Sequence, residues 1–228
     1  MRFVRLLTQV LGELLITAGV MLLVFIGWQL WWTDVTADRE QAATVQSLER
    51  QFGHPPRGVK APTLTKVAFG QAFAVIRIPR FGADYARPVL QGTTYPVLQR
   101  GLGHYLGTAL PGSVGNFAVA GHRTTYGKPL NRIATLRKGD VVVVETRASY
   151  FVYVVTGHLI VAPTQTDVVD AVPGRPAQAA TTASLTMTSC HPEFSARQRY
   201  VVFGALRRTI PRADGLPASY LATPTKGG

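Results

Sequence analysis

The sequence predicts a mainly β domain, folded as a closed or partly closed barrel, behind one membrane-spanning helix and a stalk helix. Three observations predict this fold class: a charge-free apolar run at residues 14–33, an amphipathic helical pattern up to residue 53, and many short apolar runs separated by glycine and proline after residue 65. Strands do not alternate with helical stretches, which argues against a parallel α/β domain. The 228 residues leave room for an anchor and one domain of about 150 residues.

The apolar run at residues 14–33 has the length of a transmembrane helix. Twenty helical residues at ~1.5 Å each span about 30 Å, the thickness of a bilayer core. Three tryptophans cluster at its far end, as in an interfacial aromatic belt: Trp28, Trp31 and Trp32. A cleaved signal peptide is the alternative, but its apolar region is usually about 7–15 residues long and precedes a small-residue cleavage site, which this sequence does not show clearly. We therefore expect an uncleaved anchor.

The charges that flank the anchor indicate its orientation. Arg2, Arg5 and the amino terminus precede it, which favours a cytoplasmic tail at residues 1–13. Two arginines that follow the anchor weaken this preference. We expect a single-pass protein of the cell membrane with residues 34–228 outside the cell.

Residues 34–64 are predicted to form an extracytoplasmic stalk helix and a linker. Apolar residues between Val35 and Phe52 recur near one helical face, and Gly53 with two following prolines ends the helix. The next residues have the composition of a linker. The pattern fits a stalk that packs on the domain or on a partner, and it fits a solvated spacer equally well.

Residues 65–210 are predicted to form the folded domain. Eight runs have strand length and composition: 73–78, 88–90, 116–120, 141–144, 150–155, 158–162, 183–188 and 200–206. A turn at residues 138–140 precedes the fourth run, and one short helix is expected near residues 129–136. Residues 211–228 are rich in proline, glycine and alanine, so we expect a disordered tail.

The net charge of +12 narrows the choice of partner. The basic residues are scattered and form neither a stripe interleaved with aromatic residues nor a helix-turn-helix or zinc-knuckle pattern, so no nucleic-acid partner is expected. A membrane surface or an anionic cell wall fits this charge better.

Cys190 is the single cysteine of the chain, so it cannot form a disulfide within it. Outside a membrane, such a thiol is either buried and inert or kept for chemistry. Its neighbours Thr188, Ser189 and His191 make a dry apolar pocket less natural. The local sequence leaves both readings open.

A thiol nucleophile needs a proton acceptor, and the chain offers five histidines. His122 lies at the end of an apolar strand, where an imidazole is well presented to a cleft; a capping or packed histidine is the alternative. His191 follows Cys190 directly, and neighbours in a strand point to opposite faces. The remaining three lie in the linker, in a glycine-rich loop and within a predicted strand: His54, His104 and His158.

Two arginines precede the last predicted strand, and an arginine can hold a carbonyl or a developing oxyanion because it keeps its proton. Arg199 directly abuts the strand and is better held than Arg197, although a solvated arginine is the plain alternative. The spacing of Cys190 and the histidines matches no zinc signature, so we expect neither a metal nor another cofactor.

Taken together, these motifs resemble the sortase family, the cysteine transpeptidases of Gram-positive bacteria. The resemblance rests on Ala120-Gly-His122, on Thr186-Met-Thr-Ser-Cys190 and on Arg199 at the start of a strand. It covers about residues 65–210 and extends to the anchor. Residues 115–127 and 190–199 are most similar to class E sortases of actinobacteria. The resemblance implies a sortase-type closed β-barrel of about eight strands with short helices.

The resemblance also implies a mechanism. Cys190 would attack the Thr-Gly carbonyl of a sorting signal on a secreted protein, His122 would move the proton, and Arg199 would stabilise the oxyanion or position the signal. The acceptor would be an amine of a peptidoglycan precursor. Class E similarity implies a Leu-Ala-x-Thr-Gly preference over Leu-Pro-x-Thr-Gly.

The same resemblance implies three residues that contact the sorting signal: Tyr126, Thr188 and Ser189. Ser189 stands where the family usually has threonine, so the hydroxyl is kept and a methyl group is lost. Some sortases use calcium, but the domain shows no clustered carboxylates, so no calcium is expected.

Two other functions remain open at this point. An L,D-transpeptidase-like enzyme also pairs a histidine with a later cysteine, but its cysteine typically follows a Ser-x-Gly turn, which is absent here. A non-catalytic, membrane-anchored wall-binding module would tolerate the loss of Cys190, whereas a transpeptidase would not.

Overall fold

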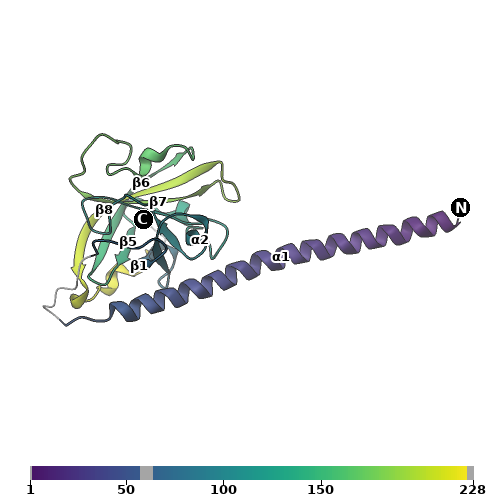
Figure 1. The fold of residues 1–228 in the computed structure, drawn as a ribbon, viewed down its shortest axis with the longest axis horizontal. Helices are drawn as coiled ribbons and strands as arrows, with labels where there is room; N and C mark the ends of the chain where they lie inside the picture. The colour runs from purple at the N-terminus through teal and green to yellow at the C-terminus, as the bar shows by residue number, and fades with distance from the viewer. Residues whose placement is uncertain (1, 57–63, 225–228) are drawn as a thin grey trace.

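The computed structural model describes residues 2–56 and 64–224, and the described residues form a closed barrel of eight strands (Figure 1). The barrel order is β1-β2-β3-β4-β7-β8-β6-β5. The strands are β1 Ala72–Arg77, β2 Ala86–Gln91, β3 Leu102–His104, β4 Gly115–Ala120, β5 Val141–Glu145, β6 Ser149–Val161, β7 Ala183–His191 and β8 Gln198–Pro211. The prediction of a closed, mainly β barrel is confirmed.

Most neighbouring strands run antiparallel, but β2 with β3 and β4 with β7 run parallel. Inside the barrel, aliphatic and aromatic side chains from the strands form one buried core, which includes Ile76, Leu102, Phe117, Tyr153 and Met187. Burial of this apolar surface is the main favourable term for a domain of this size. The rigid pair β4–β7 ends at the candidate site described below.

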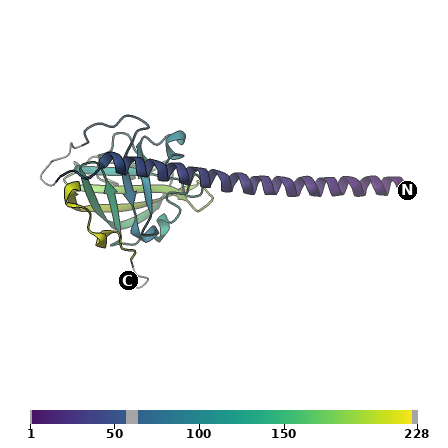
Figure 2. The ribbon, with the colours of Figure 1, turned by 90° about the horizontal axis from the view of Figure 1, so that it is seen from below.

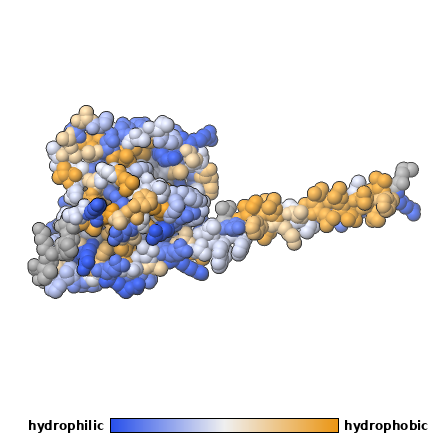
Figure 3. Space-filling model, in the orientation of Figure 1, coloured by the Kyte–Doolittle hydropathy of each residue, from blue (hydrophilic) through white to orange (hydrophobic). Residues whose placement is uncertain are grey.

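Helical structure in the described residues consists of two α-helices and five short 3₁₀ turns. They are α1 Arg2–Phe52, α2 Tyr95–Leu98, η1 Pro79–Phe81, η2 Ile133–Thr135, η3 Thr166–Val169, η4 Arg212–Asp214 and η5 Ala218–Tyr220. The expected anchor and stalk are therefore one continuous helix, whose C-terminal part lies along the barrel while the longer N-terminal part projects from it (Figure 2). The projecting part is mainly hydrophobic (Figure 3), and the helix is long and apolar enough to cross a membrane.

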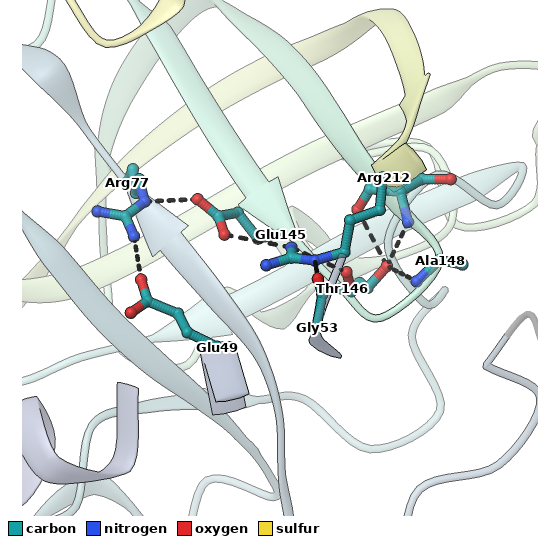
Figure 4. Close-up of polar contacts among 8 residues, drawn as sticks. Glu49, Gly53, Arg77, Glu145, Thr146, Ala148 and Arg212 are labelled. Carbon is teal, nitrogen blue, oxygen red and sulfur yellow. Dashed lines mark hydrogen bonds and ion pairs between the residues drawn. The ribbon is translucent and has the colours of Figure 1, made fainter. Parts of the chain in front are cut away.

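The C-terminal part of α1 docks on the barrel through an apolar patch and an ion-pair network. Val45, Leu48 and Phe52 pack against Val75 of β1. Figure 4 shows the network at the end of the helix: Glu49 pairs with Arg77, Arg77 with Glu145, and Glu145 with Arg212, which donates to the carbonyl of Gly53. The stalk thus packs on its own domain, which decides a question that the sequence left open.

Two strands differ from the expected pattern. The runs at 150–155 and 158–162 form a single strand, β6, because a register shift between Val155 and Gly157 accommodates the residues between the two runs without ending the strand.

β3 was expected to be part of a glycine-rich loop. Its Gly103 is required by close approach, since a Cβ there would lie 2.4 Å from the carbonyl oxygen of Gly92. Near residues 129–136 the expected helix is reduced to the 3₁₀ turn η2.

The expectation of a disordered tail is wrong for residues 211–224. Arg212 is buried, and its guanidinium lies 5.0 Å from the ring centres of both Phe52 and Tyr150. Leu216 and Tyr220 pack on the cluster that includes Tyr150. Composition suggested disorder because the segment has few apolar residues, but one sandwiched guanidinium holds it to the barrel. Residues 225–228 lie outside the described residues.

Candidate active site

Strand register brings the three predicted catalytic residues together. In the parallel pair β4–β7, Ala120 is the partner of Thr188. His122 comes two residues after Ala120, and Cys190 comes two residues after Thr188. Because β4 and β7 run parallel, His122 and Cys190 lie side by side at the same end of the barrel. In the antiparallel pair β7–β8, Cys190 is the register partner of Arg199. A thiol, an imidazole and a guanidinium therefore converge from three neighbouring strands.

These residues line one cavity of about 240 Å³. Its walls are Thr93, Leu98, Tyr105, Ala120, Gly121, His122, Thr188, Ser189, Cys190 and Arg199. A larger groove of about 500 Å³ runs over β6, β7 and β8 but contains none of the predicted catalytic residues. We assign the chemistry to the smaller cavity because its walls carry the reactive groups.

Cys190 carries a free, half-buried thiol. Its carbonyl oxygen accepts a hydrogen bond from Nη1 of Arg123 at 3.1 Å, and the same nitrogen lies 3.0 Å from Nδ1 of His191. The side chain of Arg123 is only 8% exposed, so a buried cation supports the main chain of the nucleophile strand. No local pattern in the sequence marks Arg123 as a site residue, although it directly follows His122.

In the imidazole of His122, Nε2 is buried and has no hydrogen-bond partner within the described part of the chain. Burial lowers the pKa of this imidazole below its ordinary value. The ring centres of Tyr95 and Tyr126 lie 6.1 Å and 5.3 Å from that of His122. At neutral pH the imidazole is therefore mainly neutral and able to accept a proton.

Arg199 lines the cavity, half-buried, at the start of β8. Its Nη1 donates to the carbonyl oxygens of Ala196 and Gln198, both at 3.0 Å, so the backbone at and just before the start of β8 holds the guanidinium in place. Arg197 is exposed and lies outside the walls of the cavity. The geometry thus supports the choice of Arg199 over Arg197.

The hydroxyls of the two predicted contact residues on β7 already have internal partners. Thr188 Oγ1 lies 2.9 Å from the hydroxyl of Tyr105. Ser189 is 3% exposed, and its Oγ donates to the carbonyl oxygen of Gly121 at 2.8 Å. Both residues line the cavity. The contact of Ser189 with the sorting signal stays a prediction. In the structure its hydroxyl joins β7 to the end of β4.

Tyr126, the third predicted contact residue, lies beside His122 rather than in the cavity wall. Its hydroxyl is 2.6 Å from that of Tyr95 on α2. Tyr95 and the wall residues Thr93, Leu98 and Tyr105 were not predicted as site residues. No motif in the sequence marks them, because they come from residues 93–105, in and beside α2 and β3, where the sequence predicted neither a helix nor a strand.

The other described histidines are either exposed or engaged in packing. His104 is 1% exposed in β3, and its ring nitrogens lie 2.7 Å from Oε1 of Gln91 and 3.1 Å from the carbonyl oxygen of Ala109. His158 stacks on Tyr200, and His54 is exposed. Among residues 2–56 and 64–224, no three His, Cys, Asp or Glu side chains gather in a group that could hold a metal ion.

A cysteine, a histidine and an arginine at one end of a closed β-barrel define a site of the cysteine acyl-transfer type. The sortase domain family matches residues 76–207, more than half of the chain. The chain belongs to the sortase family.

Comparison with individual proteins places the chain with the class E sortases of actinobacteria. It is 36% identical to sortase SrtE1 of Streptomyces coelicolor over 92% of this chain, and it spans 60% of that relative's length. The solved structure of sortase E from Streptomyces avermitilis is 42% identical, with a TM-score of 0.61 over 67% of this chain and 99% of that one. Sortase E1 from Streptomyces coelicolor, solved with a tripeptide in its active site, is 35% identical with a TM-score of 0.60, covering 67% of this chain and 98% of that one.

Proposed function

We propose that this protein is a membrane-anchored cysteine transpeptidase that cleaves a C-terminal sorting signal between threonine and glycine and joins the protein to an amine of a cell-wall precursor. The observation that carries this proposal is the placement of Cys190 and His122 at the paired ends of β7 and β4, facing one cavity. An acyl-transfer reaction needs a nucleophile and a proton carrier held together in this way.

The first half-reaction forms a thioacyl enzyme. His122 takes the proton of the Cys190 thiol, and the sulfur attacks the carbonyl carbon of the threonine. The carbonyl oxygen becomes an oxyanion, which the Arg199 guanidinium stabilises. When the intermediate collapses, the C–N bond breaks and His122 gives its proton to the leaving glycine amine. The neutral imidazole favoured by the lowered pKa of His122 suits this proton transfer.

The second half-reaction releases the product. The incoming amine attacks the thioester carbonyl, and His122 accepts the proton of the amine. The C–S bond then breaks, and His122 gives this proton to the leaving sulfur, which returns Cys190 as a thiol and His122 as a neutral imidazole. The tripeptide in the active site of the Streptomyces coelicolor sortase E1 structure supports a peptide substrate for this chain. We propose secreted proteins with a Leu-Ala-x-Thr-Gly signal as donors and a peptidoglycan precursor as acceptor, with Tyr126 beside the signal.

We further propose that α1 anchors the enzyme with residues 1–13 in the cytoplasm and the barrel outside the cell. The apolar, projecting part of α1 supports this arrangement. Amino-terminal sequencing of the protein from cells should return the intact start. Protease added to intact protoplasts should digest the barrel, and protection of the barrel would contradict the orientation.

The central experiment incubates the full chain in detergent with Leu-Ala-x-Thr-Gly or Leu-Pro-x-Thr-Gly peptide and a small amine. We expect a mass increase at Cys190 equal to the acyl fragment, followed by release of an amine-linked peptide, and faster turnover of the alanine-containing signal. A chain that binds wall material but forms no adduct at Cys190 would be a binding module instead.

A further inference from the structure

We infer that residues 34–52 of α1 are a working part of the active site, because they hold the loop at residues 123–129, which follows His122 and carries Tyr126. This inference rests on the proposed transpeptidase function. It goes beyond that function by assigning positioning roles to Asp34, Asp38 and Gln41. These residues follow the anchor and lie on one face of the helix, at spacings of four and three residues.

The loop has a backbone that needs external support. Tyr126, Gly127 and Lys128 follow one another with φ angles of 53°, 73° and 46°. Residues other than glycine rarely adopt this left-handed conformation. Two of them beside a glycine persist only where surrounding contacts over-determine the backbone.

α1 supplies much of that support directly. Gln41 is fully buried, and its Nε2 donates to the carbonyl oxygen of Tyr126 at 2.9 Å. Oδ1 of Asp34 accepts from the backbone nitrogen of Gly127 at 3.3 Å, and Oδ2 of the same carboxylate lies 2.8 Å from Nζ of Lys128. Each of the three left-handed residues is therefore contacted by the helix.

A second connection runs through Arg87 of β2. Asp38 pairs with Arg87 at 2.7 Å, and Arg87 donates to the carbonyl oxygen of Gly127 at 3.1 Å. The helix and the loop are also in close approach, since a Cβ on Gly127 would lie 2.7 Å from Oδ1 of Asp38. Glycine at this position lets the helix approach the loop closely enough for these contacts.

The loop in turn positions the groups next to the chemistry. It begins directly after His122, and the backbone nitrogen of Leu130 donates to the carbonyl oxygen of His122 at 3.0 Å. The ring of Tyr126 packs beside the imidazole of His122, and its hydroxyl forms a hydrogen bond with the hydroxyl of Tyr95. A shift of the loop would therefore move both Tyr126 and His122 relative to Cys190.

This connection also fixes where the site lies relative to the anchor. Eight residues separate Thr33, at the end of the apolar run, from Gln41, which is about 12 Å of helix. Figure 1 shows α2, which carries Tyr95, on the side of the barrel from which α1 departs. The site is thus held close to the end of the proposed anchor, where a membrane-attached donor would arrive.

The test compares Gln41→Leu with a matched control, Gln46→Leu, which changes an exposed glutamine of the same helix. Both are made in the full chain in nanodiscs, and peptide transfer, melting temperature and Cys190 alkylation by iodoacetamide are measured.

For Gln41→Leu we expect kcat/KM to fall about tenfold with a raised KM, a loss typical of a displaced positioning group. Cys190 alkylation should persist because β7 carries the thiol. A merely smaller folded fraction would lower kcat and leave KM unchanged.

Hydrogen exchange of residues 123–129 provides a readout that does not need activity. Exchange should rise in Gln41→Leu and not in Gln46→Leu. If the two variants match in kinetics and in exchange, the inference is overturned. If the wild type transfers no peptide, the proposed function fails, and unchanged loop exchange would overturn this inference as well. Should Gln41→Leu not fold, Asp34→Asn with Glu40→Gln as its control gives the same comparison.

Discussion

Ser189 donates its hydroxyl hydrogen to the carbonyl oxygen of Gly121 at 2.8 Å, so the residue before the proposed nucleophile is bonded to the residue before the proposed proton carrier. The backbone adds a second bond, from the nitrogen of Gly121 to the carbonyl oxygen of Thr188 at 3.1 Å. A side chain at position 121 would have to displace the core side chain of Leu102, because a Cβ there would lie 2.6 Å from its Cδ2. Together these contacts fix the ends of β4 and β7 relative to each other.

Ser189→Ala should therefore reduce transfer, whereas Ser189→Thr should retain it. Alanine leaves the buried carbonyl of Gly121 without its side-chain donor, at a cost of about 1 kcal/mol in the free energy of unfolding. The two strand ends then lose part of their alignment, and we expect kcat to fall about tenfold. Threonine keeps the hydroxyl. Steady-state peptide transfer and chemical unfolding measure the two effects.

Ser184→Ala is the matched control for this experiment. Ser184 makes the equivalent bond at the other end of the same strand pair, from its Oγ to the carbonyl oxygen of Gly115 at 3.1 Å. Its loss should lower stability to a similar degree and leave kcat nearly unchanged. Equal losses of kcat in the two alanine variants would show that the bond at Ser189 has no special relation to the chemistry.

The sequence sufficed for the barrel, because apolar runs of strand length predict strands. The set of Cys190, His122 and Arg199 came from the resemblance to the sortase family, because local patterns left an inert cysteine and a packed histidine open. The register of β4, β7 and β8 brings these three residues to one end of the barrel. The direction of the Ser189 hydroxyl was not accessible in this way, because its partner lies 68 residues away and depends on the register of β4 and β7.

What could not be predicted depends on contacts between distant segments. β3 has three residues, and its register with β2 and β4, rather than its composition, makes it a strand. Arg123 carries no local sign of burial. Arg212 orders the tail because Phe52 and Tyr150 enclose it, from positions far away in the chain. In each case tertiary packing overrides the local preference.

Cys190→Ala should abolish transfer and leave the fold nearly intact. The substitution removes the nucleophile, breaks no disulfide and changes the volume only slightly, and the side chain is half-buried. Mass spectrometry should detect no acyl adduct on the variant, and its melting temperature should stay close to that of the wild type. Residual turnover above a few per cent would contradict the nucleophile assignment. A large fall in melting temperature would indicate a structural cysteine.

The stability of the protein should fall as the pH decreases from 7 to 5. Burial lowers the pKa of His104 and of His122 below the ordinary value of 6.5. The unfolded chain therefore binds protons below pH 6.5 that the folded chain does not yet bind, and acid favours the unfolded state. Melting temperatures across this range measure the effect.

His104→Gln separates one contribution to this pH dependence. The variant should be less stable than the wild type at pH 7, because the buried imidazole of His104 and its hydrogen bonds to Gln91 and Ala109 are lost. Its melting temperature should nevertheless change less between pH 7 and pH 5. His54→Gln, at an exposed position, serves as the control and should behave as the wild type does. A wild-type melting temperature that is constant over this range would refute the assignment of a lowered pKa.

Arg199→Lys should be far more damaging than Arg197→Lys. Lysine keeps the positive charge but loses the planar fork of nitrogens. In the wild type Nη1 donates to the carbonyl oxygens of Ala196 and Gln198, which leaves the other nitrogens of the guanidinium for an oxyanion in the cavity that Arg199 lines. A single ammonium group cannot keep the same loop contacts and hold an oxyanion in the same direction. Loss of an oxyanion donor typically costs about 100- to 1,000-fold in turnover. Arg197 is exposed outside the cavity, so its replacement should change kcat less than about twofold, within the usual range for surface substitutions. If both variants are folded and Arg197→Lys proves the more damaging in peptide transfer, the oxyanion role belongs to Arg197.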